Sequence, residues 1–134
     1  MTIVVNGDGP VLAVDDDVIF RDVVELLYTA SGVKNELNLF ENGQECLDHC
    51  IRLATAGIAP SVVLMDINMP GMNGFETVKK LRQLQGFAIV PIIIMLSSSN
   101  EPLDIQRAKD AGANDYIVKP QSVDELSFAH GEAA

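Results

Sequence analysis

Four aspartates follow two short apolar segments, and their positions are the strongest chemical signal in the chain. Val11–Val14 runs directly into Asp15, Asp16 and Asp17, and a second apolar run ends at Asp66. A short apolar run bounded by polar residues is typical of a buried parallel strand. In an open α/β sheet the ligand crevice lies just beyond the carboxyl ends of the strands. The sequence therefore predicts that these carboxylates converge at one edge of a sheet.

Such a cluster of acids restricts what the site can hold. Like charges close together cannot all stay ionised without compensation, so either some pKa values rise or a cation binds. A ligand set made only of oxygens favours a hard cation such as Mg²⁺. We therefore expect a metal site here rather than an ordinary acidic surface.

Further polar side chains are predicted at the same edge. Ser97, Ser98 and Ser99 follow the fourth apolar run, and Lys119 follows the fifth. Together with the carboxylates they form a set that holds and transfers a phosphoryl group, with a carboxylate as the nucleophile that forms an aspartyl phosphate. The sequence has no Gly-x-x-x-x-Gly-Lys loop, so we do not expect a nucleotide as the phosphoryl source.

The elements that position these residues are predicted from an alternation of apolar runs and helical patterns. Alternation of this kind favours a parallel sheet covered on both faces. In helix 18–31 the pattern places Ile19, Val23, Leu26, Leu27 and Ala30 on one face, and Gly32 ends the helix. The predicted strands are 11–15, 37–40, 61–66, 91–96 and 115–118, and the predicted helices are 18–31, 44–56, 75–84, 102–111 and a last one that a capping box opens at 122–125.

Length and composition indicate one globular domain. The chain has 134 residues, of which 48% are hydrophobic and 21% charged, and this is enough for a core of its own. We expect an arm over residues 1–10 and one domain over residues 11–134. The arm is expected to be mobile, with residues 2–5 as an alternative edge strand.

The charge balance excludes some partners. The sequence has 19 acidic and 9 basic residues and a formal net charge of −10, which argues against direct binding to nucleic acid or to an anionic membrane. No apolar run approaches the roughly 20 residues that a membrane span needs. The N-terminus lacks the basic region of a signal peptide. The expected location is the cytoplasm.

The two cysteines, Cys46 and Cys50, lie one helical turn apart beside His49. That spacing is compatible with metal binding or redox chemistry. However, the cysteines continue an apolar stripe with Leu47, Ile51 and Ala54, and cysteine is commonly a small buried hydrophobe. We expect both thiols in the core.

Four motifs together resemble the receiver domain of bacterial two-component response regulators. They occur in order with the right elements between them, and the resemblance covers residues 11 to 122. It implies a doubly wound, flavodoxin-like (βα)5 fold with a five-stranded parallel sheet of order 2-1-3-4-5 and a shortened last helix. The motifs are VDDD at 14–17, MDINMPGMNG at 65–74, LSS at 96–98 and YIVKP at 116–120.

The resemblance implies a role for each matching residue. Asp66 would be the phosphoacceptor, which takes a phosphoryl group from a phosphohistidine of a sensor histidine kinase or a phosphotransfer protein. Asp15 and Asp16 match the acidic pair that holds Mg²⁺ together with Asp66, and Asn68 lies where the family supplies a backbone carbonyl to the metal. Lys119 would pair with the phosphoryl oxygens.

The switch residues are implied in the same way. Ser97 would be the switch hydroxyl, and a shift by one residue would give Ser98 that role. Tyr116 matches an aromatic whose rotamer follows phosphorylation, although packing in the core also explains a tyrosine there. The bond before Pro120 resembles the cis peptide of the family. Asp17 is interpreted as the N-cap of the first helix.

The function implied is that of a phosphoacceptor in a two-component phosphorelay, which switches a surface that binds a protein target. The chain would be a single-domain regulator or a receiver excised from a larger regulator or hybrid kinase. A homodimer through the last two helices and the fifth strand is compatible with this, and no enzymatic activity beyond self-catalysed phosphoryl transfer and loss is expected.

Two other classes remain open from the sequence. The first is an interaction module that works without phosphorylation on the same scaffold. The second is a phosphatase resembling the haloacid-dehalogenase enzymes, in which Asp15 rather than Asp66 would be the nucleophile.

Overall fold

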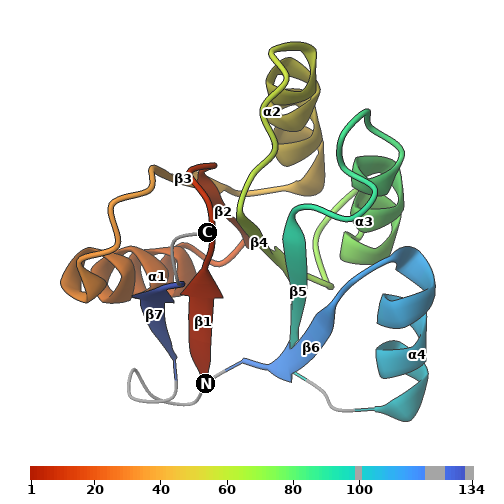
Figure 1. Ribbon diagram of the computed structural model, residues 1–134. Coiled ribbons are helices and arrows are strands. Elements are labelled where there is room, and N and C mark those ends of the chain that lie inside the picture. Colours follow the sequence, from red (N-terminus) through yellow and green to blue (C-terminus); the bar gives the residue numbers. More distant parts are fainter. Residues whose placement is uncertain (99–100, 120–125, 132–134) are drawn as a thin grey trace.

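A five-stranded parallel sheet forms the centre of the protein (Figure 1). The structure is a computed structural model, and it describes residues 1–98, 101–119 and 126–131. The order of the sheet is β3-β2-β4-β5-β6, which confirms the doubly wound order expected from the resemblance. The strands are β2 (Val11–Val14), β3 (Leu37–Phe40), β4 (Val62–Asp66), β5 (Ile92–Ser97) and β6 (Asp115–Val118).

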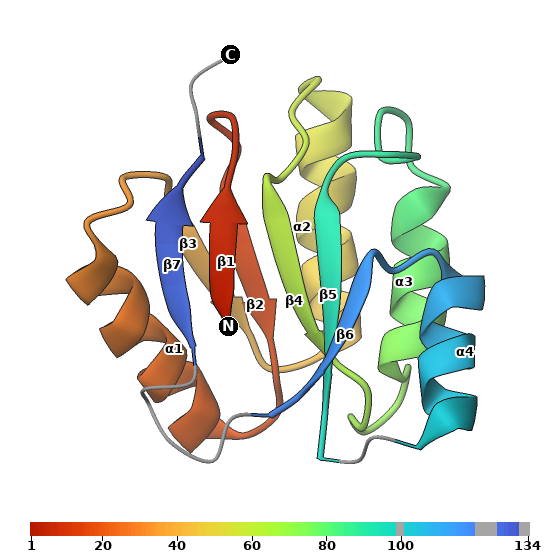
Figure 2. The same ribbon diagram turned by 60° about the horizontal axis from the view of Figure 1, so that its bottom comes forward.

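Helices cover both faces of this sheet (Figures 1 and 2). The described residues form four of them, and α2, α3 and α4 pack on one face while α1 packs on the other. All residues of β2 and β4 are buried, as expected for central strands of a sheet covered on both sides. The helices are α1 (Val18–Ser31), α2 (Gly43–Thr55), α3 (Gly74–Arg82) and α4 (Pro102–Ala111).

The predicted boundaries agree closely with the structure. Strands 37–40 and 115–118 and helices 18–31 and 102–111 begin and end as predicted, whereas β2, β4, β5, α2 and α3 differ by one or two residues at an end. Gly32 and Gly112 end α1 and α4 with φ of 78° and 110°, a left-handed conformation that glycine adopts without steric cost. Cys46 and Cys50 are free and buried in the core between α2 and the sheet, as predicted.

The core-facing side of α1 differs from the predicted stripe. Val24 and Tyr28 are buried, whereas Ile19 and Leu26 are 70% and 66% exposed. Leu27 packs against the core, so the prediction is right for that residue. The helix carries two neighbouring apolar stripes, and the periodicity of the sequence does not distinguish which of them faces the sheet.

The N-terminal arm is part of the folded structure. Residues Thr2–Val5 form β1, which pairs in parallel with β7 (Ser127–His130) in a separate two-stranded sheet, the β1–β7 ribbon. Ile3 and Val5 of β1 and Phe128 of β7 are buried against the face of the main sheet that α1 also covers. The expectation of a mobile arm was therefore wrong, and the alternative strand pairs with β7 instead of extending the edge of the main sheet.

The end of the chain differs in part from the prediction. The capping box at 122–125 and Pro120, with its expected cis peptide, lie outside the described residues. Beyond them Leu126 and Phe128 are buried while Ser127 is exposed. This alternation with a period of two is typical of a strand, which explains why these residues form β7. No helix in the described ranges is long and apolar enough to cross a membrane.

A first prediction concerns the packing of the ribbon. Ile3→Ala should lower the free energy of unfolding by about 2–4 kcal/mol because it deletes buried methyl groups. Val4→Ala, on the exposed side of the same strand, should change it by less than about 0.5 kcal/mol. Chemical denaturation of both variants measures the difference. Equal small effects would mean that β1 does not pack on the sheet.

Candidate functional site

The register of the sheet brings Asp15 and Asp66 to the same level. Val14 of β2 pairs with Met65 of β4, so each strand delivers an aspartate as its next residue. Both carboxylates are buried, with 1% and 3% of the residue exposed. The convergence predicted from the two apolar runs is therefore present.

Local hydrogen bonds hold Asp15 in place. Its backbone N–H donates to the carbonyl of Phe40 at 3.0 Å, and its Oδ1 accepts from the backbone N–H of Asp17 at 2.9 Å. Nη1 of Arg21 in α1 donates to the backbone carbonyl of Asp15 at 2.6 Å. The turn that carries the acidic pair is thus tied to β3 on one side and to α1 on the other.

The loop after β4 holds Asp66. The backbone N–H of Ile67 donates to the carbonyl of Leu96 at 3.1 Å, and the N–H of Gly74 donates to the carbonyl of Ile67 at 3.0 Å. A Cβ atom at Gly74 would collide with the backbone oxygen of Asp66. Only glycine allows α3 to begin this close to the end of β4.

Lys119 brings a positive charge to the two buried acids. Its Nζ lies 2.8 Å from Oδ2 of Asp15 and 3.5 Å from Oδ1 of Asp66. Its backbone N–H donates to the carbonyl of Ser97 at 2.7 Å, so the end of β6 is fixed to the end of β5. The ammonium also lies over the ring of Phe20, with the ring centroid 5.0 Å from Nζ.

The electrostatics of the site are unbalanced. Burial raises the pKa of Asp66, and the charges of Asp15 and Asp16 add to this, so that the pKa is about 7 despite the opposing effects of Lys119 and of a hydrogen bond from the backbone of Asn68. Burial lowers the pKa of Lys119, but its contacts with Asp15 and Asp66 outweigh burial and the net shift is upward. The ammonium therefore stays charged, and it does not fully compensate the acids.

The residues present fit a hard cation. Asp15, Asp16 and Asp66 each offer a carboxylate oxygen, and these atoms lie within 4.8 Å of one another. Oδ2 of Asp15 is buried and, within the described ranges, pairs with the ammonium of Lys119 without making a well-directed hydrogen bond. Several oxygens with excess negative charge and unused acceptor capacity are the donor set that Mg²⁺ prefers.

The predicted switch residues lie at different levels of the sheet relative to the acidic cluster. Ser97 is buried at the end of β5, one residue beyond Leu96, which pairs with Asp66, whereas Ser98 is exposed. Tyr116 pairs with Met95, packs against the core and lines a cavity of about 130 Å³ beside α4. The switch roles of these residues stay predictions.

Asp17 has the position that the sequence predicts. Asp17 caps α1 by accepting a hydrogen bond from the backbone N–H of Ile19 at 3.0 Å, which confirms its interpretation as an N-cap. Sequence reasoning missed the contacts of Phe20 and Arg21 with the site. In the sequence an apolar and a charged residue in the first turn of a helix indicate only a core position and a solvated one.

The fold and the site together define a class of protein. The protein is a doubly wound α/β domain, and the carboxyl edge of its sheet is where ligands of such folds bind. That edge carries the paired carboxylates of Asp15 and Asp16, the carboxylate of Asp66 and the ammonium of Lys119.

Comparisons with known proteins identify the family. The sequence matches the response regulator receiver domain family over residues 11–129. It is 37% identical to two-component response regulator ORR1 of Oryza sativa subsp. japonica over 119 residues, which covers 86% of this chain and 51% of that protein. It is 38% identical over 117 residues to the DNA-binding transcriptional regulator NtrC of Escherichia coli (strain K12), covering 87% of this chain and 23% of that protein. The chain therefore belongs to the response regulator receiver domain family.

A solved structure supports the same assignment. Chemotaxis protein CheY4 of Vibrio cholerae superposes with a TM-score of 0.74 at 30% identity, covering 88% of this chain and 92% of that one. The chain spans about half of ORR1 and about a quarter of NtrC. These relatives come from a plant and a bacterium, so the similarity does not restrict the source to bacteria. Receiver domains are signalling domains and not conventional enzymes.

A second prediction follows from the raised pKa of Asp66. The carboxyl has a pKa of about 7 in the fold against an ordinary value of 3.8, so between these values the folded state binds more protons than the unfolded state. The stability of the metal-free protein should therefore fall as the pH rises from about 4 to about 7.

The variant Asp66→Asn removes this loss. In EDTA the free energy of unfolding of Asp66→Asn should exceed that of the wild type by more at about pH 8 than at about pH 5. The difference between these two gains should be on the order of 2 kcal/mol. Denaturant titrations at both values measure it. Asp17→Asn, which keeps the helix cap, serves as the control. If Asp66→Asn gained the same free energy of unfolding at both pH values, the raised pKa of Asp66 would be contradicted.

Proposed function

We propose that this domain accepts a phosphoryl group on Asp66 and transmits the resulting change to a protein target. The observation that carries the proposal is the placement of Asp66. This buried carboxylate lies 3.5 Å from the ammonium of Lys119 and within the cluster that it forms with Asp15 and Asp16. A nucleophile, a set of cation ligands and a donor for phosphoryl oxygens thus occur together.

The reaction is a transfer from a phosphohistidine. An oxygen of the ionised Asp66 carboxylate attacks phosphorus, the P–O bond forms and the P–N bond breaks, and the imidazole leaves with the electron pair and takes up a proton. Mg²⁺ held by Asp15, Asp16 and Asp66, with the backbone carbonyl of Asn68, would neutralise charge on the phosphoryl oxygens. Lys119 donates to one of those oxygens and stabilises the charge there.

The response is a shift between two conformations. The phosphoryl group adds acceptors that draw the Ser97 hydroxyl and the Lys119 ammonium toward Asp66, and the ring of Tyr116 moves into the space that this leaves. A shift from 1:99 to 99:1 needs about 5.5 kcal/mol of differential interaction. Charge-assisted hydrogen bonds of about 1.5–3 kcal/mol each can supply it.

The arrangement argues against Asp15 as the nucleophile. Its Oδ1 accepts the backbone N–H of Asp17, and its Oδ2 forms the shorter of the two ion pairs with Lys119. Asp66 has the weaker pairing with the ammonium and the raised pKa. The phosphatase alternative, which needs Asp15 to attack, is therefore less well supported than phosphorylation of Asp66.

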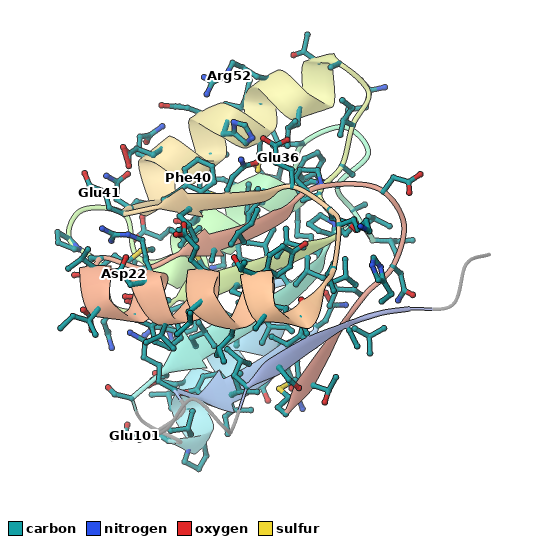
Figure 3. All side chains as sticks on the ribbon, turned by 90° about the vertical axis from the view of Figure 1, so that its left-hand side faces the viewer. Asp22, Glu36, Phe40, Glu41, Arg52 and Glu101 are labelled. Carbon is teal, nitrogen blue, oxygen red and sulfur yellow. The ribbon has the colours of Figure 1, made fainter. Side chains whose placement is uncertain are left out.

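The partner that delivers the phosphoryl group is a phosphohistidine protein, a sensor kinase or a phosphotransfer protein, and it docks on α1. This helix begins at the acidic turn, and its stripe of exposed Ile19 and Leu26 with the partly buried Val23 between them runs away from the site. Figure 3 shows Asp22 of α1 and Glu41 toward the end of the molecule where α1 begins and β3 ends. An apolar stripe flanked by acidic groups fits a helical surface with basic residues at its rim.

The output surface and the cellular location complete the proposal. The domain acts in the cytoplasm. Its target or a second copy binds to α4 and β6, where Leu103 and Val118 are 69% and 43% exposed.

A third prediction tests the phosphoacceptor. Incubation with acetyl phosphate should give one phosphoryl adduct by intact-mass spectrometry, and the adduct should require both Mg²⁺ and Asp66. Asp66→Asn should abolish it, and Asp15→Asn should slow it by about 10- to 100-fold because a cation ligand is lost. An adduct that survives in Asp66→Asn but not in Asp15→Asn would support the phosphatase alternative. No adduct under any condition would support the module that works without phosphorylation.

A fourth prediction tests the docking surface. Leu26→Glu should slow transfer from a phosphohistidine protein at least about tenfold, because it places a charge in the apolar contact. Its rate with acetyl phosphate should not change, since the small donor needs no docking. Leu103→Glu on α4 is the matched control and should leave both rates unchanged. If Leu26→Glu and Leu103→Glu accepted the phosphoryl group from the phosphohistidine protein at the same rate, α1 would not be the docking helix.

A further inference from the structure

Phe20 contacts the lysine of the site, although nothing in its residue type indicates a part in phosphoryl transfer. The centroid of its ring lies 5.0 Å from Nζ of Lys119, within the range of a cation–π contact. The ring is partly buried and packs against the core cluster beneath α1. Its position is therefore set by the fold and does not depend on the lysine.

The ammonium has three neighbours of different character. It is paired with Asp15 at 2.8 Å and with Asp66 at 3.5 Å, and the third neighbour is the face of the Phe20 ring. An ammonium has three N–H donors, and an aromatic face attracts the charge without offering the strong acceptor of a carboxylate or an amide. The donors thus remain available for the oxygens at the edge of the sheet.

The side chain of Lys119 needs such a restraint. It is a flexible four-carbon chain that ends in a compact charge, and 23% of it is exposed to solvent. An ammonium surrounded by water would be free to turn away from the carboxylates. The Phe20 ring lies against part of the ammonium instead, with its centroid 5.0 Å from Nζ.

We propose that Phe20 is a positioning residue for phosphoryl transfer, whose ring holds the Lys119 ammonium against the Asp15–Asp66 edge. The inference rests on the proposed function of Asp66 and adds a residue to it. The ring acts through the lysine and does not touch the transferred group.

The test compares variants that keep or remove the aromatic face. Phe20→Leu retains an apolar side chain but loses the ring, and its initial rate of phosphorylation by acetyl phosphate with Mg²⁺ should fall about three- to tenfold, as expected for the loss of one cation–π contact. Phe20→Trp keeps an aromatic face and should restore most of the rate. Leu27→Ala, in the same helix and core cluster, should lower the stability without lowering the rate.

A second comparison separates positioning from a general structural effect. In a Lys119→Met background Phe20→Leu should have no further effect on the rate, because the group through which the ring acts is missing. The same fall in both backgrounds, or a similar fall in Leu27→Ala, would overturn the proposal.

A direct readout keeps this inference distinct from the proposed function. By NMR the ε-methylene protons of Lys119 should show an upfield ring-current shift that disappears in Phe20→Leu and persists in Phe20→Trp. A wild type that forms the Asp66 adduct but shows no such shift would overturn the role of Phe20. A wild type that shows the shift but forms no adduct would overturn the function of Asp66, and with it any role of Phe20 in transfer.

Discussion

The compensation of two buried carboxylates by one lysine is the interaction on which the rest of this structure depends. Asp15 directly follows β2 and Asp66 ends the neighbouring parallel strand β4, and the register of these strands brings both to the same level, so the fold itself forces two acids together. The positive charge comes from β6, which is separated from β4 by β5. The hydrogen bond from Lys119 to Ser97 fixes the end of β6 at the height where the side chain can reach across. The strand order β2-β4-β5-β6 therefore determines which charged groups meet at this edge of the sheet.

The compensation is incomplete, and this is what gives the site its chemical character. Asp16 joins the other two carboxylates, so one ammonium faces three acids and the pKa of Asp66 rises. A raised pKa in a buried acid means that its ionised form costs stability, which the two packed faces of the sheet must offset. The same deficit of positive charge fits the cation that we propose for this site. Under the proposed function, the carboxylate that is costly in the resting fold is the group that would gain most from a bound cation or from phosphorylation.

Local sequence patterns predicted the parts of the fold that local physics determines. The central strands, their acidic ends and the cap at Asp17 all follow from short-range preferences, and the structure agrees. The side of α1 that faces the sheet was not predictable, because Ile19 and Leu26 form a stripe as apolar as the one that is buried. The β1–β7 ribbon joins residues from the two ends of the chain, and a strand pattern carries no information about such a distant partner. The contact of Phe20 with Lys119 depends on that same tertiary arrangement.

The ribbon also bears on the site, although it contains none of its charged groups. Soon after Lys119 the chain reaches Leu126 and Phe128, whose side chains are buried in the cluster that also holds Leu96 of β5. The rings of Phe128 and Tyr28 of α1 pack in a T-shaped contact, with their centroids 5.1 Å apart. The backbone of Lys119 is thus held by its hydrogen bond to Ser97 of β5, and β7 is held by the packing of Leu126 and Phe128. Among the residues that the structure describes, β7 pairs only with β1, so the N-terminal residues help to support the face of the main sheet behind the candidate site.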